Sequence, residues 1–251
     1  MYNLWELLNF HIMNKLIIMN KSLLSKIIWP LIYLAATIAI CISITVVVFK
    51  NHYYENVFVD GRSMNPTLKG EIGVVDGAHF GYTDNRDMTK KRLERFDIIT
   101  TYYPFSSEDY ELPYIKGESK IKKDAYYKIK RLIALPGETF KIEDNNLFIL
   151  SNDSWEEIAF TYERATEEFY YKDVPETTLS EDEYWVMGDN WTLNGSKDCA
   201  TRQSFDTFNG PIYYENIIGK LVAIEGECTL EIVNGVVVCE NKHYYKNKIY
   251  Y

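Results

Sequence analysis

Metal-binding and cross-linking residues are scarce in this sequence, which has four cysteines and four histidines among 251 residues. It contains no C-x-x-C pair and no cluster of histidine and cysteine, so a metal site is not predicted. Cys41 lies inside a long apolar run, which leaves Cys199, Cys228 and Cys239 outside it, an odd number that does not make a disulfide framework. The sequence therefore predicts neither a metalloprotein nor a small disulfide-rich domain.

A hairpin turn is predicted at Asn234-Gly235, between Cys228 and Cys239. In a two-residue hairpin with this turn, Cys228 faces Asn241 rather than Cys239, so the two cysteines are diagonal neighbours. The sequence does not decide whether a disulfide links them.

Positive charge is also in short supply, with 27 lysine and arginine residues against 36 aspartate and glutamate residues. The first 50 residues carry four lysines and one glutamate, so the rest of the chain holds 23 basic and 35 acidic residues. A body this acidic would be repelled by phosphate backbones, and a nucleic-acid partner is not predicted. The 47% of hydrophobic and 15% of aromatic residues exclude a disordered chain.

What the sequence does have is one long uncharged run, IIWPLIYLAATIAICISITVVVF, at residues 27–49. Its 23 positions are enough, at 1.5 Å per residue in a helix, to cross a hydrocarbon core of about 30 Å. A cleavable signal peptide is the alternative, but such peptides have a shorter apolar region, and no A-x-A-like cleavage pattern follows Phe49. We therefore predict a transmembrane helix.

Lysines flank this run unevenly, because Lys15, Lys21 and Lys26 precede it, and this favours a cytoplasmic N-terminus. The predicted organisation is a cytoplasmic segment 1–26, the transmembrane helix and an extracytoplasmic domain over 50–251. We thus expect a single-pass protein of the cell membrane with its larger domain outside.

Beyond the run, the sequence predicts an all-β domain, because short stretches rich in β-branched and aromatic residues alternate with turn signals. These stretches are GEIGVVDG at 70–77, RFDIITTYY at 95–103, YYKIKRLIAL at 126–135, TFKIEDNNLFIL at 139–150, EYWVMGD at 183–189, NIIGKLVAIEG at 216–226 and CTLEIVNGVVVC at 228–239. A smaller lobe or insertion is expected within about 139–183, which includes an acidic stretch.

The stretch VFVDGRSMNPTLKGE, residues 57–71, places Ser63 soon after the apolar run. A serine hydroxyl attacks a carbonyl only when a base removes its proton and donors stabilise the oxyanion. The nucleophile elbow G-x-S-x-G is excluded because Asn65 stands where its second glycine would be. The three histidines after the run lie in no stretch that reads as a site, so a Ser-His-Asp triad is not predicted either.

A lysine is the other base open to serine, since burial lowers the pKa of a lysine by up to about 3–5 units and can leave it neutral near pH 7. Lys128 and Lys130, in the stretch YKIKRLIALPGETF at 127–140, are the candidates. Taken alone, either lysine would be read as a solvated surface charge.

Four motifs considered together change that interpretation. They are SMNPTL at 63–68, RFDIIT at 95–100, KRLIALPGE at 130–138, and MGDN at 187–190 with SKD at 196–198. Their order and spacing resemble those of the bacterial type I signal peptidases, which also have a transmembrane segment directly before the first motif. The resemblance covers the chain from residue 27 to about 225, and it implies a signal-peptidase-like antiparallel β-sheet body.

The resemblance implies that Ser63 is the nucleophile and that Lys130 is the general base. It also implies an oxyanion hole that uses the backbone N–H of Ser63. Some family members add a hydroxyl two residues earlier, where this chain has Gly61, so only backbone donors can serve here. Asp189 is implied to belong to a structural polar network behind the base.

In the next segment, the resemblance makes Ser196 the serine that positions the lysine amine and Asp198 the aspartate that ties the segment down, with Arg202 as its ionic partner. The family's usual form is GDNRxxSxDSR, but here a tryptophan follows the asparagine, two extra residues precede the serine, and CATR follows the aspartate. Thr192 and Thr201 are therefore competing hydroxyls for the positioning role.

The function implied by the resemblance is a membrane-anchored serine endopeptidase that removes signal peptides from secreted preproteins. The preprotein is expected to bind as an extended peptide along a strand edge, near Met64, with small side chains at the first and third positions before the cut. Membrane lipid is the other expected partner, because Ser63 follows the run by only 14 residues. No cofactor is implied.

Two other classes of protein remain open. A non-catalytic relative could use the same fold as a pilin-assembly or docking factor, but such a protein has no need of Ser63 or Lys130. A self-cleaving regulator of the SOS type shares a serine-lysine dyad on a related fold, but it carries a DNA-binding domain where this chain has a membrane run.

Overall fold

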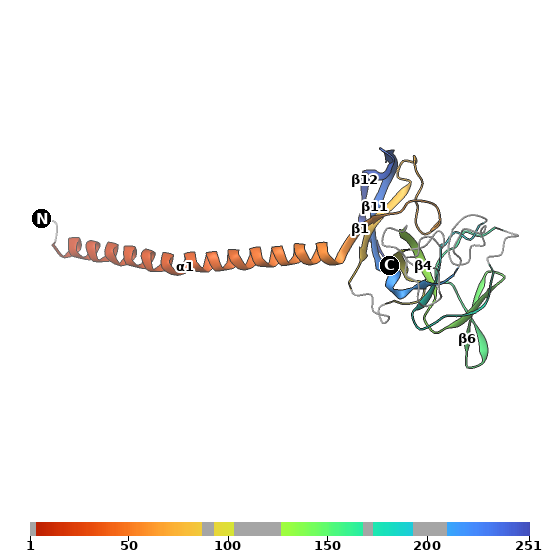
Figure 1. Ribbon diagram of the computed structural model, residues 1–251. Coiled ribbons are helices and arrows are strands. Elements are labelled where there is room, and N and C mark those ends of the chain that lie inside the picture. Colours follow the sequence, from red (N-terminus) through yellow and green to blue (C-terminus); the bar gives the residue numbers. More distant parts are fainter. Residues whose placement is uncertain (1–3, 87–92, 103–126, 168–172, 193–209) are drawn as a thin grey trace. The chain divides into compact units, whose positions relative to one another are not determined.

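The computed structural model describes residues 4–86, 93–102, 127–167, 173–192 and 210–251 (Figure 1). The chain divides into two compact units, Met1–His52 and Tyr53–Tyr251, and each is described by itself. The first unit is helical and the second is built mainly from antiparallel strands. The prediction of a mostly β fold with one N-terminal apolar helix is therefore confirmed.

Helix α1 runs from Leu4 to Tyr53. Within it, the 26 residues Ser25–Lys50 have a mean hydropathy of 2.6, and this stretch is long and apolar enough to cross a membrane. The helix begins well before the apolar run because the residues that precede the run include no proline or glycine to interrupt it. Such a helix fits a membrane-anchored protein.

The larger sheet of the body has eight strands, in the order β1-β2-β11-β3-β4-β9-β10, with β12 paired to β11. Its strands are β1 Tyr54–Phe58, β2 Ala78–Asp84, β3 Ile98–Tyr102, β4 Tyr127–Ala134, β9 Glu183–Met187, β10 Ile212–Tyr213, β11 Ile217–Val233 and β12 Val236–Tyr250. The long strand β11 pairs with β3 near its start, with β2 along its middle and with β12 toward its end. It therefore connects most of the sheet.

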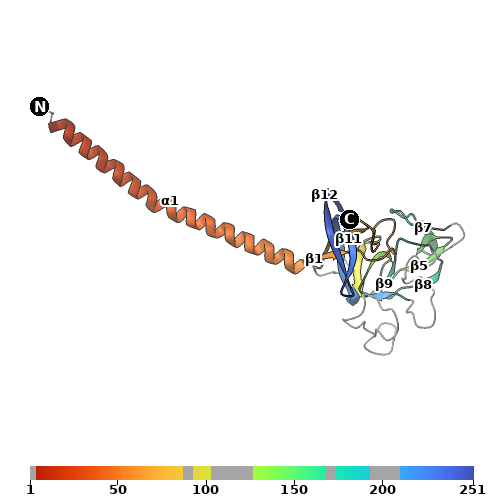
Figure 2. The ribbon, with the colours of Figure 1, turned by 90° about the horizontal axis from the view of Figure 1, so that it is seen from above.

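A second sheet has four strands in the order β7-β6-β5-β8. These are β5 Thr139–Glu143, β6 Asn146–Ser151, β7 Ser154–Ile158 and β8 Val174–Thr178. Two tight turns connect β5 to β6 and β6 to β7, and Asp144, Asn145, Asn152 and Asp153 adopt positive φ there, as short polar side chains tolerate. Figure 2 shows this sheet and the β11–β12 hairpin at opposite ends of the body.

The two sheets share one apolar core. Ile99 and Leu132 from the larger sheet pack in the same buried cluster as Phe140 and Ile142 from the second sheet. A separate cluster lies beneath the segment after β1, and its buried members are Val57, Val59, Met64, Leu68, Ile98, Leu221 and Ile224. The candidate nucleophile is thus attached to a packed part of the body.

One predicted strand is wrong. The stretch GEIGVVDG forms only isolated bridges at Gly70 and Ile72, followed by turns. The φ angles of Gly73 and Asp76 are +75° and +50°, which an extended strand cannot contain. Its β-branched residues suggested a strand, but three glycines within eight residues favour turns.

The β11–β12 hairpin also settles the cysteine question. Pairing begins at the predicted turn and continues to Thr229 opposite Glu240, but a register shift then places Glu227 opposite His243. Cys228 and Cys239 form a disulfide, with their Cα atoms 5.7 Å apart, within the usual range for a bridge. The diagonal bridge is therefore made, whereas Cys199 lies outside the described residues.

Candidate active site

Ser63 lies in a turn that follows β1 and packs on buried apolar side chains. Its neighbour Met64 and the nearby Leu68 are both 0% exposed, and the Leu68 N–H donates to the Met64 carbonyl at 2.9 Å. The Asn65 N–H donates to the Arg62 carbonyl at 3.1 Å. The apolar side chains hold the turn down by burial, while the serine itself stays partly exposed.

Lys130 lies within the regular strand β4, opposite Ile99 of β3. It is only 1% exposed, and its Nζ lies 2.9 Å from Ser63 Oγ and 3.2 Å from the Ile129 carbonyl oxygen. Burial disfavours the charged ammonium, and a neutral amine can accept the serine proton through its lone pair. The structure thus brings the two residues of the predicted dyad within hydrogen-bond distance.

Asp189 lies behind this pair, in a buried ion pair with Arg131. The Arg131 Nε donates to Asp189 Oδ1 at 2.8 Å and Nη2 donates to Oδ2 at 2.6 Å, with Asp189 fully buried. The Arg131 Nη1 donates to the Phe96 carbonyl at 2.8 Å. A buried pair is tolerated when its donors and acceptors are satisfied in this way. Sequence reasoning placed Asp189 in a polar network but missed Arg131 as its partner, although Arg131 directly follows the candidate base.

Asn190 connects the Asp189 turn to the serine turn. Its N–H donates to the Ser63 carbonyl at 3.0 Å, and its Nδ2 donates to the Arg62 carbonyl at 3.1 Å. The Thr192 hydroxyl donates to Asn190 Oδ1 at 2.6 Å. The resemblance implied only that Asn190 shapes the turn, because hydrogen bonds to the main chain of a distant segment leave no signal in the motif.

The two predicted oxyanion donors differ in their surroundings. The Gly61 N–H already donates to the Gly70 carbonyl at 2.7 Å, which leaves the Ser63 N–H as the better candidate. Gly61 has a φ of +90°, a conformation that favours glycine, and a Cβ on Gly70 would come within 2.4 Å of the Gly61 oxygen. The close contact between the Gly61 and Gly70 backbones fixes the path of the chain as it enters the serine turn.

The remaining predicted site residues are not brought to the dyad by described contacts. Met64 is buried in the cluster beneath the turn, and its predicted contact with substrate stays a prediction. Ser196, Asp198 and Arg202 lie outside the described residues, as does the competing Thr201.

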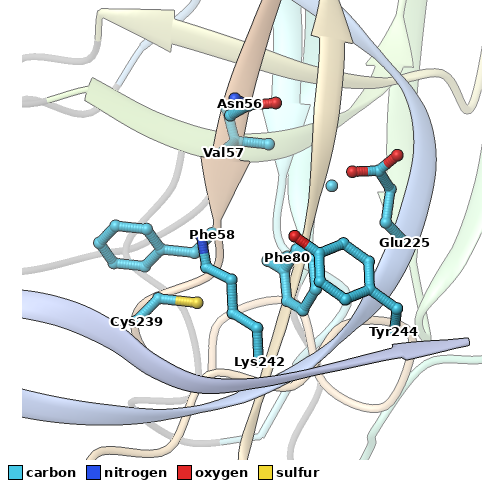
Figure 3. Close-up of a pocket in the computed structure, with 9 residues that line it drawn as sticks. Asn56, Val57, Phe58, Phe80, Glu225, Cys239, Lys242 and Tyr244 are labelled. Atoms are coloured by element: carbon cyan, nitrogen blue, oxygen red, sulfur yellow. The ribbon is translucent and has the colours of Figure 1, made fainter.

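A separate hollow lies on the body, lined by β1, β2, β11 and β12 (Figure 3). Phe58 and Phe80, which are paired across β1 and β2, contribute its rings together with Tyr244. Glu225 and Lys242 add one charge of each sign. Neither Ser63 nor Lys130 lines this hollow, so it is distinct from the dyad.

A family model described as "Signal peptidase, peptidase S26" matches residues 29–225 of the chain. The chain belongs to this signal peptidase family. The match includes Ser63, Lys130 and Asp189, whereas most of the β11–β12 hairpin lies beyond it. The disulfide and most of the hairpin are therefore outside the part of the chain that the family model describes.

Relatives of this signal peptidase family member point to the bacterial type I enzymes. "Signal peptidase I V" of Bacillus subtilis (strain 168) is 28% identical over 197 residues, which cover 74% of this chain and 93% of the relative. "Signal peptidase I P" of Bacillus subtilis subsp. natto is 28% identical over 184 residues, 70% of this chain and 76% of the relative. The crystal structure of a signal peptidase I from Enterococcus faecalis V583 aligns at 24% identity with a TM-score of 0.34, covering 51% of this chain and 96% of that one.

Proposed function

We propose that this chain is a membrane-anchored serine endopeptidase that cuts signal peptides from secretory preproteins, with Ser63 as nucleophile and Lys130 as general base. The observation that carries the proposal is the 2.9 Å distance between Lys130 Nζ and Ser63 Oγ, combined with the burial of the lysine. Membership of the signal peptidase family supports the substrate class.

The proposed chemistry begins with a neutral Lys130. Its amine takes the hydroxyl proton as Ser63 Oγ attacks the scissile carbonyl, and the Ser63 N–H stabilises the oxyanion that forms. The lysine then gives this proton to the leaving amine, which releases the mature protein and leaves an acyl-serine. Water, deprotonated by the same lysine, attacks the ester and frees the signal peptide.

The sheet offers two strand edges on which an extended peptide could pair. Among the described strands, β1 pairs only with β2, and β4 pairs with β3 over Tyr127–Arg131 but with β9 only from Arg131 onward. The two edges are near enough to interact. The pKa of Tyr127 on β4 is raised mainly by burial, and the Glu55 carboxylate on β1 contributes to the rise. Backbone pairing on these edges would supply affinity, and shallow pockets for small side chains would supply specificity.

The proposed location puts the body on the outer side of the cell membrane. Lysines before the run favour a cytoplasmic N-terminus, and secretory precursors emerge on the opposite side. The short segment between the apolar run and the serine supports an active site close to the lipid surface, because Ser63 follows Lys50 by only 13 residues.

The experiment is to incubate the detergent-solubilised full chain with a secretory precursor and to map the cut by mass spectrometry. We expect cleavage after small residues at the first and third positions before the cut, and none with Ser63→Ala. Cleavage of the chain itself in the absence of precursor would favour the self-cleaving class. An intact precursor after long incubation with the wild-type chain would contradict the proposed function.

A further inference from the structure

A short segment outside the dyad packs against the turn at Asp189–Trp191, which is itself hydrogen-bonded to the Ser63 carbonyl through Asn190. Residues 160–165, which we call the strap, follow β7 and lie outside the named strands. Phe160, Tyr162 and Arg164 alternate along it, and all three contact residues of the site region. The strap belongs to the stretch between the strands of the second sheet, so its contacts join the two sheets near the dyad.

Contacts between aromatic rings and guanidinium groups join the strap to the residues around Asp189. The Phe160 ring meets the Trp191 ring edge-on, with centroids 5.3 Å apart. The Arg164 guanidinium carbon lies 3.6 Å from the Phe160 ring centroid and 4.4 Å from that of Trp191. The guanidinium carbon of Arg131, the partner of Asp189, lies 3.8 Å from the Tyr162 ring centroid. At such distances the ring faces attract the cations.

The main chain of the strap is also hydrogen-bonded to the turn. The Ala165 N–H donates to the Asp189 carbonyl at 3.0 Å, and the Trp191 N–H donates to the Ala165 carbonyl at 2.7 Å. These two bonds flank Asn190, whose own N–H donates to the Ser63 carbonyl. A continuous path of contacts thus runs from the strap through Asn190 to the nucleophile.

Trp191 stands where the usual family motif has an arginine, and the strap contacts it. Where that motif has arginine after GDN, this chain places a fully buried indole, whose Nε1 donates to the Gly188 carbonyl at 2.8 Å. The planar cation comes instead from Arg164, whose Nη1 donates to the Asn145 carbonyl at 2.7 Å. In this chain the strap thus supplies a guanidinium beside the turn.

We propose that Arg164 and Tyr162 are positioning residues, which hold the Asp189–Asn190 turn so that Asn190 keeps Ser63 within reach of Lys130. This inference rests on the proposed peptidase function. A strap that merely packed the second sheet would contribute to stability, but its loss would leave the turnover of folded enzyme unchanged.

The test compares variants of the full chain in detergent, below the melting temperature of each. Arg164→Lys keeps the charge but loses the planar stack, and Tyr162→Ala removes the ring over Arg131. We expect each to lower kcat by about ten-fold with KM within about two-fold, since the affected contacts position the reacting groups rather than the substrate. Tyr162→Phe, which keeps the ring, should retain turnover, and Glu163→Gln, at an exposed position between the two, is the matched control.

Hydrogen exchange of peptides that contain Asn190 provides a readout that does not need activity. Faster exchange there in Arg164→Lys and Tyr162→Ala, together with the selective loss of kcat, supports the strap. Exchange equal to wild type, or faster exchange with unchanged kcat in a chain that cuts precursor, overturns it. If the wild-type chain cuts no precursor, the proposed function fails, and the exchange rates alone then decide whether the strap holds the turn.

Discussion

The two residues of the dyad are held in place by different kinds of structure. Lys130 lies inside a regular strand, where backbone pairing with β3 fixes its position. Ser63 lies in an irregular turn held by apolar residues beneath it and by two hydrogen bonds from Asn190. The position of the proposed base is therefore a property of the sheet, whereas that of the proposed nucleophile depends on contacts between segments far apart in the sequence.

Replacing Ser63 or Lys130 tests whether both residues are needed for cleavage of the precursor. Ser63→Ala, Lys130→Met and Lys130→Arg should each lower kcat by about 1,000-fold or more, because a serine nucleophile and its base act as a unit and arginine does not deprotonate. Precursor cleavage measures the loss, and circular dichroism checks the fold. Lys128→Met is the control, and turnover close to wild type in any of the three dyad variants would contradict the dyad.

The next largest effect should come from breaking the buried ion pair behind the dyad. Asp189→Ala leaves the Arg131 guanidinium buried without its partner, which typically costs about 3–5 kcal/mol of unfolding free energy. Removing an exposed pair should cost about 0–1 kcal/mol, and Glu143→Gln, which loses the contact with Lys141, is the matched control. Denaturant unfolding in detergent gives both values, and equal losses would show that the buried pair has no special role.

The base side of the comparison can be sharpened by pH. If Lys130 acts as a neutral amine, kcat/KM should fall about ten-fold per pH unit on the acid side, with an apparent pKa well below the value of ~10.4 for a free lysine. The sign follows because protonation removes the lone pair that accepts the serine proton. A pH–rate profile with precursor provides the measurement, and activity that stays flat down to about pH 5 would point to a different base.

The hydroxyl that positions the base can be assigned by two substitutions. If Ser196 orients the lysine amine, Ser196→Ala should lower kcat about ten-fold, as expected for a lost hydrogen bond of roughly 0.5–1.5 kcal/mol. Thr192→Ala should have less effect, because the Thr192 hydroxyl already donates to Asn190. The reverse order in steady-state kinetics would move the positioning role to Thr192.

The smallest expected effect concerns the support of the serine turn at His79. Burial lowers the pKa of His79, although the Glu227 carboxylate opposes this, and its Nδ1 accepts a hydrogen bond from the Lys69 N–H at 3.3 Å. Because the folded pKa lies below the unfolded value, His79 contributes stability above about pH 6.5, which is lost as pH falls through the folded pKa.

Thermal melts from pH 7 to pH 5 test this contribution. We expect the Tm to fall a few degrees less in His79→Gln than in wild type, since 1 kcal/mol moves the Tm of a domain this size by about 2–4 °C. Glu227 should not titrate in this window, because its own pKa is lowered, chiefly by the hydrogen bond from Lys69. His243→Gln, at an exposed position, is the control. The same dependence of Tm on pH in all three proteins would show that His79 makes no such contribution.

The sequence predicted the parts of this molecule that local patterns encode. The apolar run, the hairpin turn at Asn234-Gly235 and the strands β3, β4, β5, β6, β9 and β11 follow from composition and turn residues, whereas β1, β2, β7, β8 and β10 were not predicted. Ser63 and Lys130 were singled out by the resemblance of their motifs to a known family. The register shift between Thr229 and Glu227 could not be predicted, because a bulge leaves the alternation of side chains intact on each side of it. The strap was missed for a different reason, since its contacts with the turn at Asp189 join segments whose spacing fits no motif.

Adjacent positions on β4 carry one further consequence. Lys130 and Arg131 point to opposite faces of the strand, one toward Ser63 and the other toward Asp189. A slip of one residue between β4 and β3 would exchange them and present to the serine a cation that cannot lose its proton. Such a misfolded chain could be compact and still be chemically inert. Under the proposed mechanism, accurate pairing of β4 with β3 during folding is therefore a condition for turnover as well as for stability.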